Sequence, residues 1–175
     1  MVSAPVRPLL LIGFMGAGKT TVGRLVADAL GRPFCDLDTE IEGSTGRTVD
    51  ELFATLGETG FRDREREALR RLCGREGLVV ACGGGVVTDE GSRALLRECG
   101  DVIYLIVSSE EALARVGSEH SGRPLLRGTS ADAAASLLHS RERLYEAEAD
   151  FGVLTSGRTP QEIADRIVTW VRSRA

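Results

Sequence analysis

The sequence predicts an α/β fold with a parallel sheet covered by helices on both sides. Short apolar runs alternate along the chain with segments of helical periodicity, which is the pattern of strands joined by crossover helices. The apolar runs are continuous instead of alternating with polar residues, so both faces of the sheet must be covered. The first run passes through a glycine-rich turn into the first helical segment, as in many open α/β sheets.

Five strands are expected where apolar runs end in glycine or polar residues. They occupy Leu9–Phe14, Pro33–Leu37, Leu78–Cys82, Val102–Val107 and Phe151–Thr155. Parallel neighbours require right-handed crossovers, and ligands in such sheets bind beyond the carboxyl ends of the strands. The chemistry of this protein is therefore expected at that edge.

Capping signals predict where several helices begin and end. Thr48 to Glu51 has the form of a capping box, with a helix through Leu56 that Gly57 ends. Thr159 to Glu162 combines a hydroxyl N-cap, proline at N1 and glutamate at N3, and so begins the last helix. The expected helices are Lys19–Leu30, the one after Thr48, about Glu58–Cys73, about Ser108–Val116, about Asp132–Ala149 and Pro160 to about Arg172.

Composition places the chain among compact proteins of one domain, here residues 1–175. A net charge of −4 argues against a nucleic-acid partner. The apolar runs are far shorter than the ~20 residues that span a bilayer, and a secretory signal is not found. We expect a cytoplasmic monomer with no membrane association. Four cysteines without a C-x-x-C pair are expected as buried, reduced thiols.

The segment Gly13 to Thr20 matches the phosphate-binding pattern G-x-x-x-x-G-K-[ST] between a strand and a helix. Its backbone N–H groups and the helix amino terminus attract phosphate oxygens. Lys19 is the only lysine among 22 basic residues, and its compact ammonium suits the β- and γ-phosphates. The Thr20 hydroxyl can bind Mg²⁺. The predicted cofactors are ATP and Mg²⁺, bound by Gly16, Ala17, Gly18, Lys19, Thr20 and Thr21.

Two carboxylates follow the second strand, Asp36 and Asp38. On an extended chain, alternate residues lie on the same side, so both could face the phosphates. One carboxylate can orient and deprotonate an attacking hydroxyl, and Asp36 is the candidate to hold Mg²⁺ through water. The alternative is that both aspartates only cap a turn.

Two further segments are candidates for the acceptor site. Arg62 follows an aromatic residue, and Glu65 lies one helical turn on, where it could orient the guanidinium. The rest of the charged segment Arg62–Arg71 is expected to be a solvated helix face. Gly83–Gly85 directly follows a buried strand and offers backbone N–H donors to a ligand, with a flexible turn as the alternative.

The polar, glycine-punctuated segment 117–128 is predicted to be a lid. Closure would exclude water from the γ-phosphate and bring Arg123 to the charge of the transferring group. The alternative is an ordinary surface loop.

Taken together, these motifs resemble the shikimate kinase family. They are the G-x-M-G-x-G-K-T loop, Asp36-x-Asp38, Phe61-Arg62 with Glu65, Gly83-Gly84-Gly85, Arg123-Pro124-Leu125-Leu126 and Arg141-x-x-Leu144-Tyr145. The resemblance implies a fold like that of P-loop nucleoside monophosphate kinases, three α/β/α layers with strand order 2-3-1-4-5. It also implies a substrate-binding region over about 36–65 and transfer of the γ-phosphate of ATP to the 3-hydroxyl of shikimate, in aromatic amino acid biosynthesis.

By motif, the resemblance also implies individual roles. Asp38 would bind the shikimate hydroxyls and orient the nucleophile, while Arg62 and Arg141 would bind the carboxylate. Gly83, Gly84 and Gly85 would add backbone contacts. Lys19, Asp38 and Arg123 would be catalytic, and the adenine pocket would be lined by Arg115 and by the stretch from Arg158 to Pro160.

Three other functions are alternatives to this one. A regulatory GTPase would need an N-K-x-D element, which a chain whose only lysine is Lys19 does not contain. A nucleoside monophosphate kinase would need an acceptor site richer in arginine, because its acceptor is a phosphate ester. A gluconate-type kinase stays open as an alternative.

Overall fold

The computed structural model describes residues 6–118 and 130–174. Within these residues, one parallel sheet runs in the order β2-β3-β1-β4-β5. Its strands are β1 (Leu9–Ile12), β2 (Phe34–Asp36), β3 (Val79–Ala81), β4 (Asp101–Ile106) and β5 (Phe151–Leu154). The predicted fold class, strand positions and strand order are confirmed.

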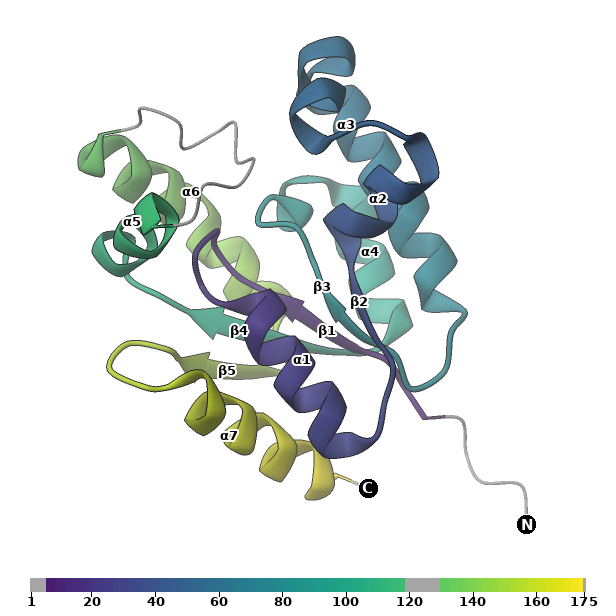
Figure 1. Ribbon diagram of the computed structural model, residues 1–175, viewed down its shortest axis with the longest axis vertical. Coiled ribbons are helices and arrows are strands. Elements are labelled where there is room, and N and C mark those ends of the chain that lie inside the picture. The colour runs from purple at the N-terminus through teal and green to yellow at the C-terminus, as the bar shows by residue number, and fades with distance from the viewer. Residues whose placement is uncertain (1–5, 119–129, 175) are drawn as a thin grey trace.

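Helices cover both faces of the sheet (Figure 1). They are α1 (Lys19–Leu30), α2 (Leu37–Thr45), α3 (Val49–Cys73), α4 (Glu90–Cys99), α5 (Ser109–Ser118), α6 (Ala131–Glu148) and α7 (Pro160–Arg172), with a 3₁₀ turn, η1, at Val86–Thr88. Helices α1 and α7 pack together on one face, and α4 and α6 lie across the other. None of the described helices is both long and apolar enough to cross a membrane.

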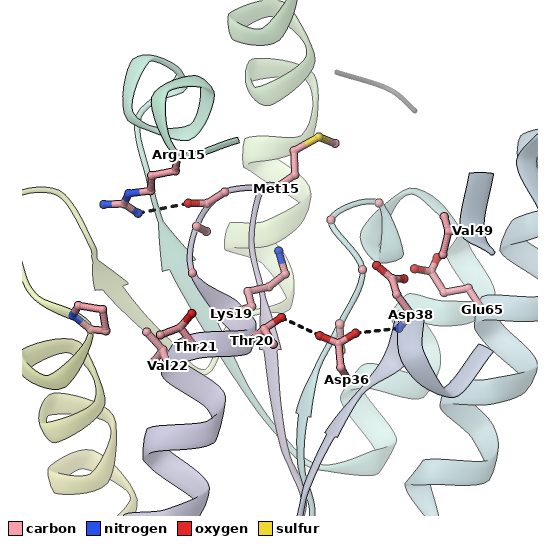
Figure 2. Close-up of a pocket in the computed structure, with 18 of the residues that line it drawn as sticks. Met15, Lys19, Thr20, Thr21, Val22, Asp36, Asp38, Val49, Glu65 and Arg115 are labelled. Atoms are coloured by element: carbon pink, nitrogen blue, oxygen red, sulfur yellow. Dashed lines mark hydrogen bonds between the residues drawn. The ribbon is translucent and has the colours of Figure 1, made fainter. Parts of the chain in front are cut away.

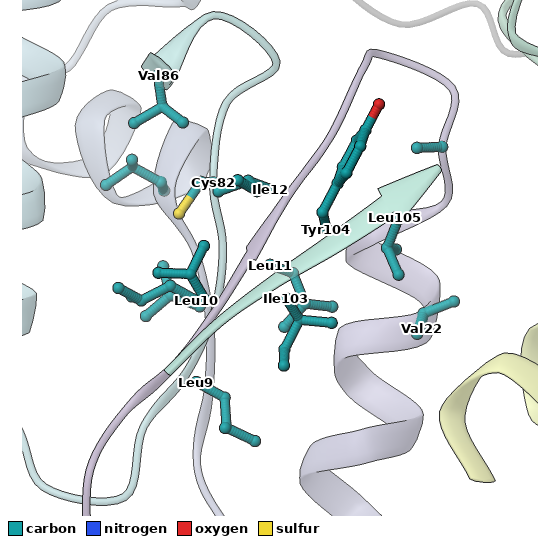
Figure 3. Close-up of a cluster of buried hydrophobic side chains, with 14 of the residues drawn as sticks. Leu9, Leu10, Leu11, Ile12, Val22, Cys82, Val86, Ile103, Tyr104 and Leu105 are labelled. Atoms are coloured by element: carbon teal, nitrogen blue, oxygen red, sulfur yellow. The ribbon is translucent and has the colours of Figure 1, made fainter. Parts of the chain in front are cut away.

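The core is centred on β1, whose four residues are all buried. Figure 3 shows their side chains leaving the strand in both directions, Leu11 toward α1 and Leu10 toward the opposite face. A strand in the middle of a parallel sheet must be apolar on both faces, which is why the sequence of β1 is continuous instead of alternating. The rigid sheet holds the loops that follow β1, β2 and β3 at one edge.

Both predicted capping boxes form. Thr48 begins α3 and accepts a hydrogen bond from the Glu51 amide, and Thr159 begins α7 in the same way with Glu162. The predicted break at Gly57 is also present: its φ of 68° and ψ of −177° interrupt α3 with a kink. The two expected helices are therefore one kinked element.

The expected state of the cysteines was partly wrong. The structure joins Cys73 and Cys99 in a disulfide, because α3 and α4 lie side by side and each ends in a cysteine. Cys82 is a buried free thiol as expected, whereas the free thiol of Cys35 is only partly buried. Spacing in the sequence gave no sign of the pairing, since 26 residues separate the two partners.

Candidate active site

The phosphate-binding loop lies between β1 and α1 and is shaped by glycines in the left-handed region. Gly16 has a φ of 80°, and a Cβ there would lie 2.6 Å from the Ala112 carbonyl oxygen. Gly18 has a φ of 90° and caps α1. The Lys19 ammonium donates to the carbonyls of Gly13 (2.8 Å) and Phe14 (3.0 Å). The loop thus directs a helix amino terminus and a cation toward one point, as a polyanion site requires.

Asp36 links the loop to the second strand. Its Oδ2 accepts a hydrogen bond of 2.6 Å from the Thr20 hydroxyl, and its Oδ1 accepts one of 3.1 Å from the Asp38 amide (Figure 2). Adjacent oxygen donors of this kind fit Mg²⁺, which takes one or two protein oxygens and completes its shell with phosphate and water. The described residues contain no cluster of three or more His, Cys, Asp or Glu that could hold a metal alone.

The geometry of the two aspartates differs from the prediction. They were expected on one side of an extended chain, but helix α2 begins directly after Asp36, which is its N-cap. Asp38 lies in the first turn of α2, and Figure 2 shows it and Lys19 rising into the cavity from opposite walls. Asp36 therefore both caps α2 and accepts a hydrogen bond from the Thr20 hydroxyl.

Burial raises the pKa of Asp38 above its ordinary value, and the negative charge of Asp36 raises it further.

Arg62 and Glu65 form a buried pair on α3, as the sequence predicted. Arg62 Nη1 donates to Glu65 Oε2 at 2.6 Å, and the side chains are 8% and 0% exposed. The guanidinium lies 5.4 Å from the ring centroid of Phe61 and 5.8 Å from that of Phe53. Burial raises the pKa of Glu65 to about 7, although Arg62 opposes this rise.

Two buried polar atoms of this pair have no hydrogen-bond partner among the described residues. They are Arg62 Nε and Glu65 Oε1. A Cβ on Gly83 would lie 2.3 Å from Glu65 Oε1, and one on Gly85 would lie 1.9 Å from Arg62 Nη2. The glycines after β3 thus make room for the pair. Buried polar atoms without partners are costly, so this pair is held in place at a cost in stability.

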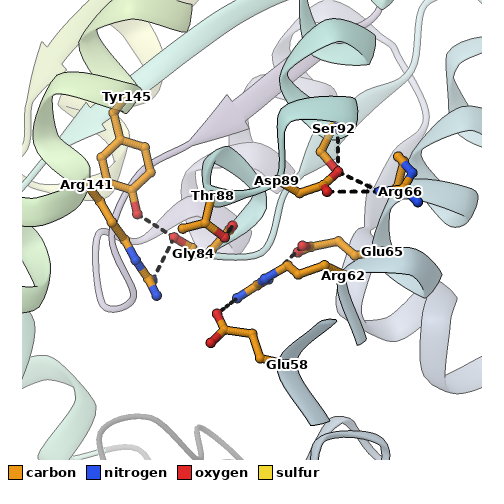
Figure 4. A network of polar contacts seen from close by, with 11 residues as sticks. Glu58, Arg62, Glu65, Arg66, Gly84, Thr88, Asp89, Ser92, Arg141 and Tyr145 are labelled. Atoms are coloured by element: carbon orange, nitrogen blue, oxygen red, sulfur yellow. Dashed lines mark hydrogen bonds and ion pairs between the residues drawn. The ribbon is translucent and has the colours of Figure 1, made fainter. Parts of the chain in front are cut away.

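Arg141 and Tyr145 approach the glycine loop from α6. Arg141 Nη1 donates to the Gly84 carbonyl at 3.3 Å, and the Tyr145 hydroxyl donates to the same oxygen (Figure 4). Both side chains are buried. The structure therefore places Arg141 beside the loop.

The predicted adenine side is formed by α5, α7 and the loop after β5. Arg115 Nη1 donates to the Gly16 carbonyl at 3.2 Å and lies 3.4 Å from Thr155 Oγ1. Arg158 donates to the Leu154 carbonyl at 2.8 Å. Arg123, together with most of the predicted lid at 117–128, lies outside the described residues.

One cavity of about 600 Å³ joins these groups, a size typical of small-molecule sites. Every described residue predicted for the site lines it except Arg141 and Thr159. They include Gly16, Ala17, Gly18, Lys19, Thr20, Thr21, Asp36, Asp38, Arg62, Gly83, Gly84, Gly85, Arg115, Arg158 and Pro160.

Some functional residues were missed or misjudged. Phe53 and Ile163 line the cavity, but an apolar residue at helical spacing has the same pattern whether it faces a core or a ligand. Arg66 was expected on a solvated face. It instead donates to both oxygens of Asp89, at 2.9 and 3.0 Å, and so joins α3 to the N-cap of α4 (Figure 4).

Comparison with known proteins gives a consistent result. The family model described as "Shikimate kinase" matches residues 15–172. Shikimate kinase of Geobacter sulfurreducens is 43% identical over 95% of this chain and 91% of its own length. That of Bordetella avium is 46% identical over 87% of this chain and 73% of its own length.

Solved structures agree with the sequence comparison. Shikimate kinase from Acinetobacter baumannii, in complex with shikimate, superposes with a TM-score of 0.90 at 38% identity, covering 97% of this chain and 94% of that one. A gluconokinase from Sinorhizobium meliloti covers 98% of this chain and 94% of its own at a TM-score of 0.61, but at 22% identity it shows the fold alone. The chain therefore belongs to the shikimate kinase family, whose members are ATP-dependent kinases.

Proposed function

We propose that the two walls of the cavity divide the reaction between them: one binds ATP, and the other presents the 3-hydroxyl of shikimate to the γ-phosphate. The observation that carries this proposal is the lining of a single cavity by Lys19 and Thr20 together with Asp38, Arg62 and the glycine loop. A phosphate site and an acceptor site that open into one cavity can hold two small molecules close enough for direct transfer.

The nucleotide wall consists of the phosphate-binding loop and the residues around it. Backbone N–H groups from Gly16 to Thr21 bind the phosphates, and the Lys19 ammonium leaves its loop carbonyls for the β- and γ-phosphates. Thr20 and Asp36 would hold Mg²⁺, Asp36 through water, and the ion would neutralise charge on the β- and γ-phosphate oxygens. Arg115 and Arg158 border the adenine.

The acceptor wall recognises a small hydroxy acid. Two guanidinium groups, Arg62 and Arg141, bind the carboxylate with charge-assisted hydrogen bonds, and Glu65 keeps Arg62 in one orientation. Asp38 accepts a hydrogen bond from the 3-hydroxyl and takes its proton as the oxygen attacks phosphorus, a role that a raised pKa favours.

Arg123 is proposed, from its motif alone, to reach the transferring phosphate when segment 117–128 closes. Composition and charge support the further proposal of a cytoplasmic, monomeric enzyme of one domain, with no nucleic-acid or membrane partner.

The test is an acceptor panel with purified protein. ATP and Mg²⁺ are supplied with shikimate, gluconate or AMP, and ADP release is measured. Shikimate should give the highest kcat/KM by far, and Lys19→Ala should abolish turnover of every acceptor. A higher kcat/KM for gluconate or AMP would replace the proposed function with a gluconate-type or nucleoside monophosphate kinase.

Metal dependence is checked in the same assay. Excess EDTA should stop ADP release, and added Mg²⁺ should restore it. Turnover that survives EDTA would contradict the assignment of Thr20 and Asp36.

A further inference from the structure

Tyr145 is a fully buried residue of α6 for which the proposed reaction has no role. Its ring stacks on Tyr104 of β4, with centroids 5.1 Å apart. Its hydroxyl donates to the carbonyl of Gly84, in the loop that borders the acceptor wall. A buried tyrosine hydroxyl needs a polar partner, and here the partner belongs to the substrate site.

The Gly84 carbonyl receives two donors, the Tyr145 hydroxyl and Arg141 Nη1. A carbonyl oxygen has two lone pairs, so both acceptor positions are occupied. The two donors come from the same helix, one turn apart, and Figure 4 shows both reaching the oxygen from the α6 side. The orientation of the Gly84–Gly85 peptide is therefore set by α6.

That orientation has a consequence for the opposite side of the loop. In a planar trans peptide the C=O and N–H bonds point in opposite directions, and the described chain contains no cis peptide. With the carbonyl turned toward α6, the Gly85 N–H points away from α6. The same carbonyl accepts a hydrogen bond from one nitrogen of the Arg141 guanidinium. The other N–H groups of Arg141 are then left to bind a carboxylate.

We infer that Tyr145 is a positioning residue for substrate recognition: its hydroxyl fixes the Gly84 carbonyl, and through it both the Gly85 N–H and the Arg141 guanidinium that bind the acid. This inference rests on the proposed function, because it assumes that the acceptor is a carboxylate bound at this loop. Burial raises the pKa of Tyr145, so the hydroxyl stays protonated and remains a donor at neutral pH.

The test removes the hydroxyl and keeps the ring. In Tyr145→Phe, KM for shikimate should rise about fivefold, the loss expected for one neutral hydrogen bond, while KM for ATP stays within twofold of the wild type. Tyr104→Phe is the matched control, because it removes a hydroxyl from the other ring of the same stack. It should leave both KM values unchanged.

A merely structural role predicts a different pattern. It would lower Tm or the active fraction while leaving both KM values as they are, so Tm is measured for each variant. In an Arg141→Lys background, Tyr145→Phe should raise KM for shikimate by less than the fivefold expected in the wild type, because one of the two groups that Tyr145 positions is already lost.

Three results would overturn the inference. They are an unchanged KM for shikimate, an equal rise for both substrates, and the same rise in Tyr104→Phe. Turnover of shikimate by the wild type is recorded separately. If it is absent, the proposed function fails and the inference fails with it, whereas wild-type turnover combined with any of the three results refutes the inference alone.

Discussion

Replacing Gly85 by alanine tests whether the lack of a side chain at Gly85 allows the Arg62 guanidinium to take its observed position. The added Cβ would lie 1.9 Å from Arg62 Nη2 and 2.4 Å from Cζ, while unbonded heavy atoms need about 3.5 Å. The guanidinium must therefore retreat by more than about 1 Å, against its 2.6 Å bond to Glu65. Because Gly85 has a φ of −105°, alanine fits the backbone, and the effect comes from the side chain.

A displacement of about 1 Å in a substrate-positioning group can cost about 10²-fold in rate. We expect kcat/KM for shikimate to fall by about that factor in Gly85→Ala, with KM for ATP unchanged, in an ADP-release assay. Gly43→Ala makes the same chemical change inside α2, where no atom lies within 4 Å of the new Cβ, and should keep full activity. A kcat/KM for Gly85→Ala within threefold of the wild type would refute the reasoning.

Three further predictions concern the pair on α3 and the disulfide. Arg62→Lys should raise KM for shikimate more than KM for ATP, because only shikimate is bound by the planar guanidinium that the variant lacks. An equal rise in both KM values would indicate damage to the fold. Reducing the Cys73–Cys99 bond, which spans 26 residues, should lower the free energy of unfolding by about 3 to 4 kcal/mol. Denaturant curves with and without dithiothreitol measure this, with the Cys73→Ser/Cys99→Ser variant as control, and coincident wild-type curves would contradict it. Burial raises the pKa of Glu65 from 4.5 to about 7, so between these values the folded state keeps a proton that the unfolded state has lost. Its contribution to stability is complete below pH 4.5 and is lost as the pH rises through 7. Relative to Glu65→Gln, the free energy of unfolding should fall by about 3 kcal/mol across that window, and a constant difference would exclude the shift.

Local sequence patterns predicted most of the strands and helices. Continuous apolar runs predicted the buried strands, and the capping signals at Thr48 and Thr159 predicted the first residues of two helices. These features depend on neighbours within four residues, so the sequence shows them directly. Gly57 belongs to the same class, because a positive φ is a property of one residue.

Contacts between distant segments were not predictable in the same way. Helix α2 was missed because Asp36 was assigned to an extended chain, although it is an N-cap whose carboxylate also accepts from Thr20 across 16 residues. The disulfide between Cys73 and Cys99 and the ion pair between Arg66 and Asp89 depend on α3 packing beside α4. Nothing in the spacing of these residues encodes that packing.

In the site, too, local features were predictable and contacts between distant segments were not. Residues within one motif, such as Lys19 and Thr20, lie where the motif predicts. Arg141 contacts the Gly84 carbonyl and does not line the cavity as the structure describes it, so its contact with the carboxylate stays a prediction. Tyr145 belongs to the same motif, but the motif alone does not indicate the hydrogen bond that its hydroxyl donates to the loop.

Asp38, across the cavity from Lys19, is proposed to take the proton of an attacking hydroxyl. This role is tested by kcat for Asp38→Asn, measured together with ATP binding by equilibrium titration. The amide keeps the size of the side chain but cannot accept that proton, so kcat should fall by at least about 10²-fold while the Kd for ATP stays the same. An unchanged kcat, with ATP bound normally, would contradict the claim.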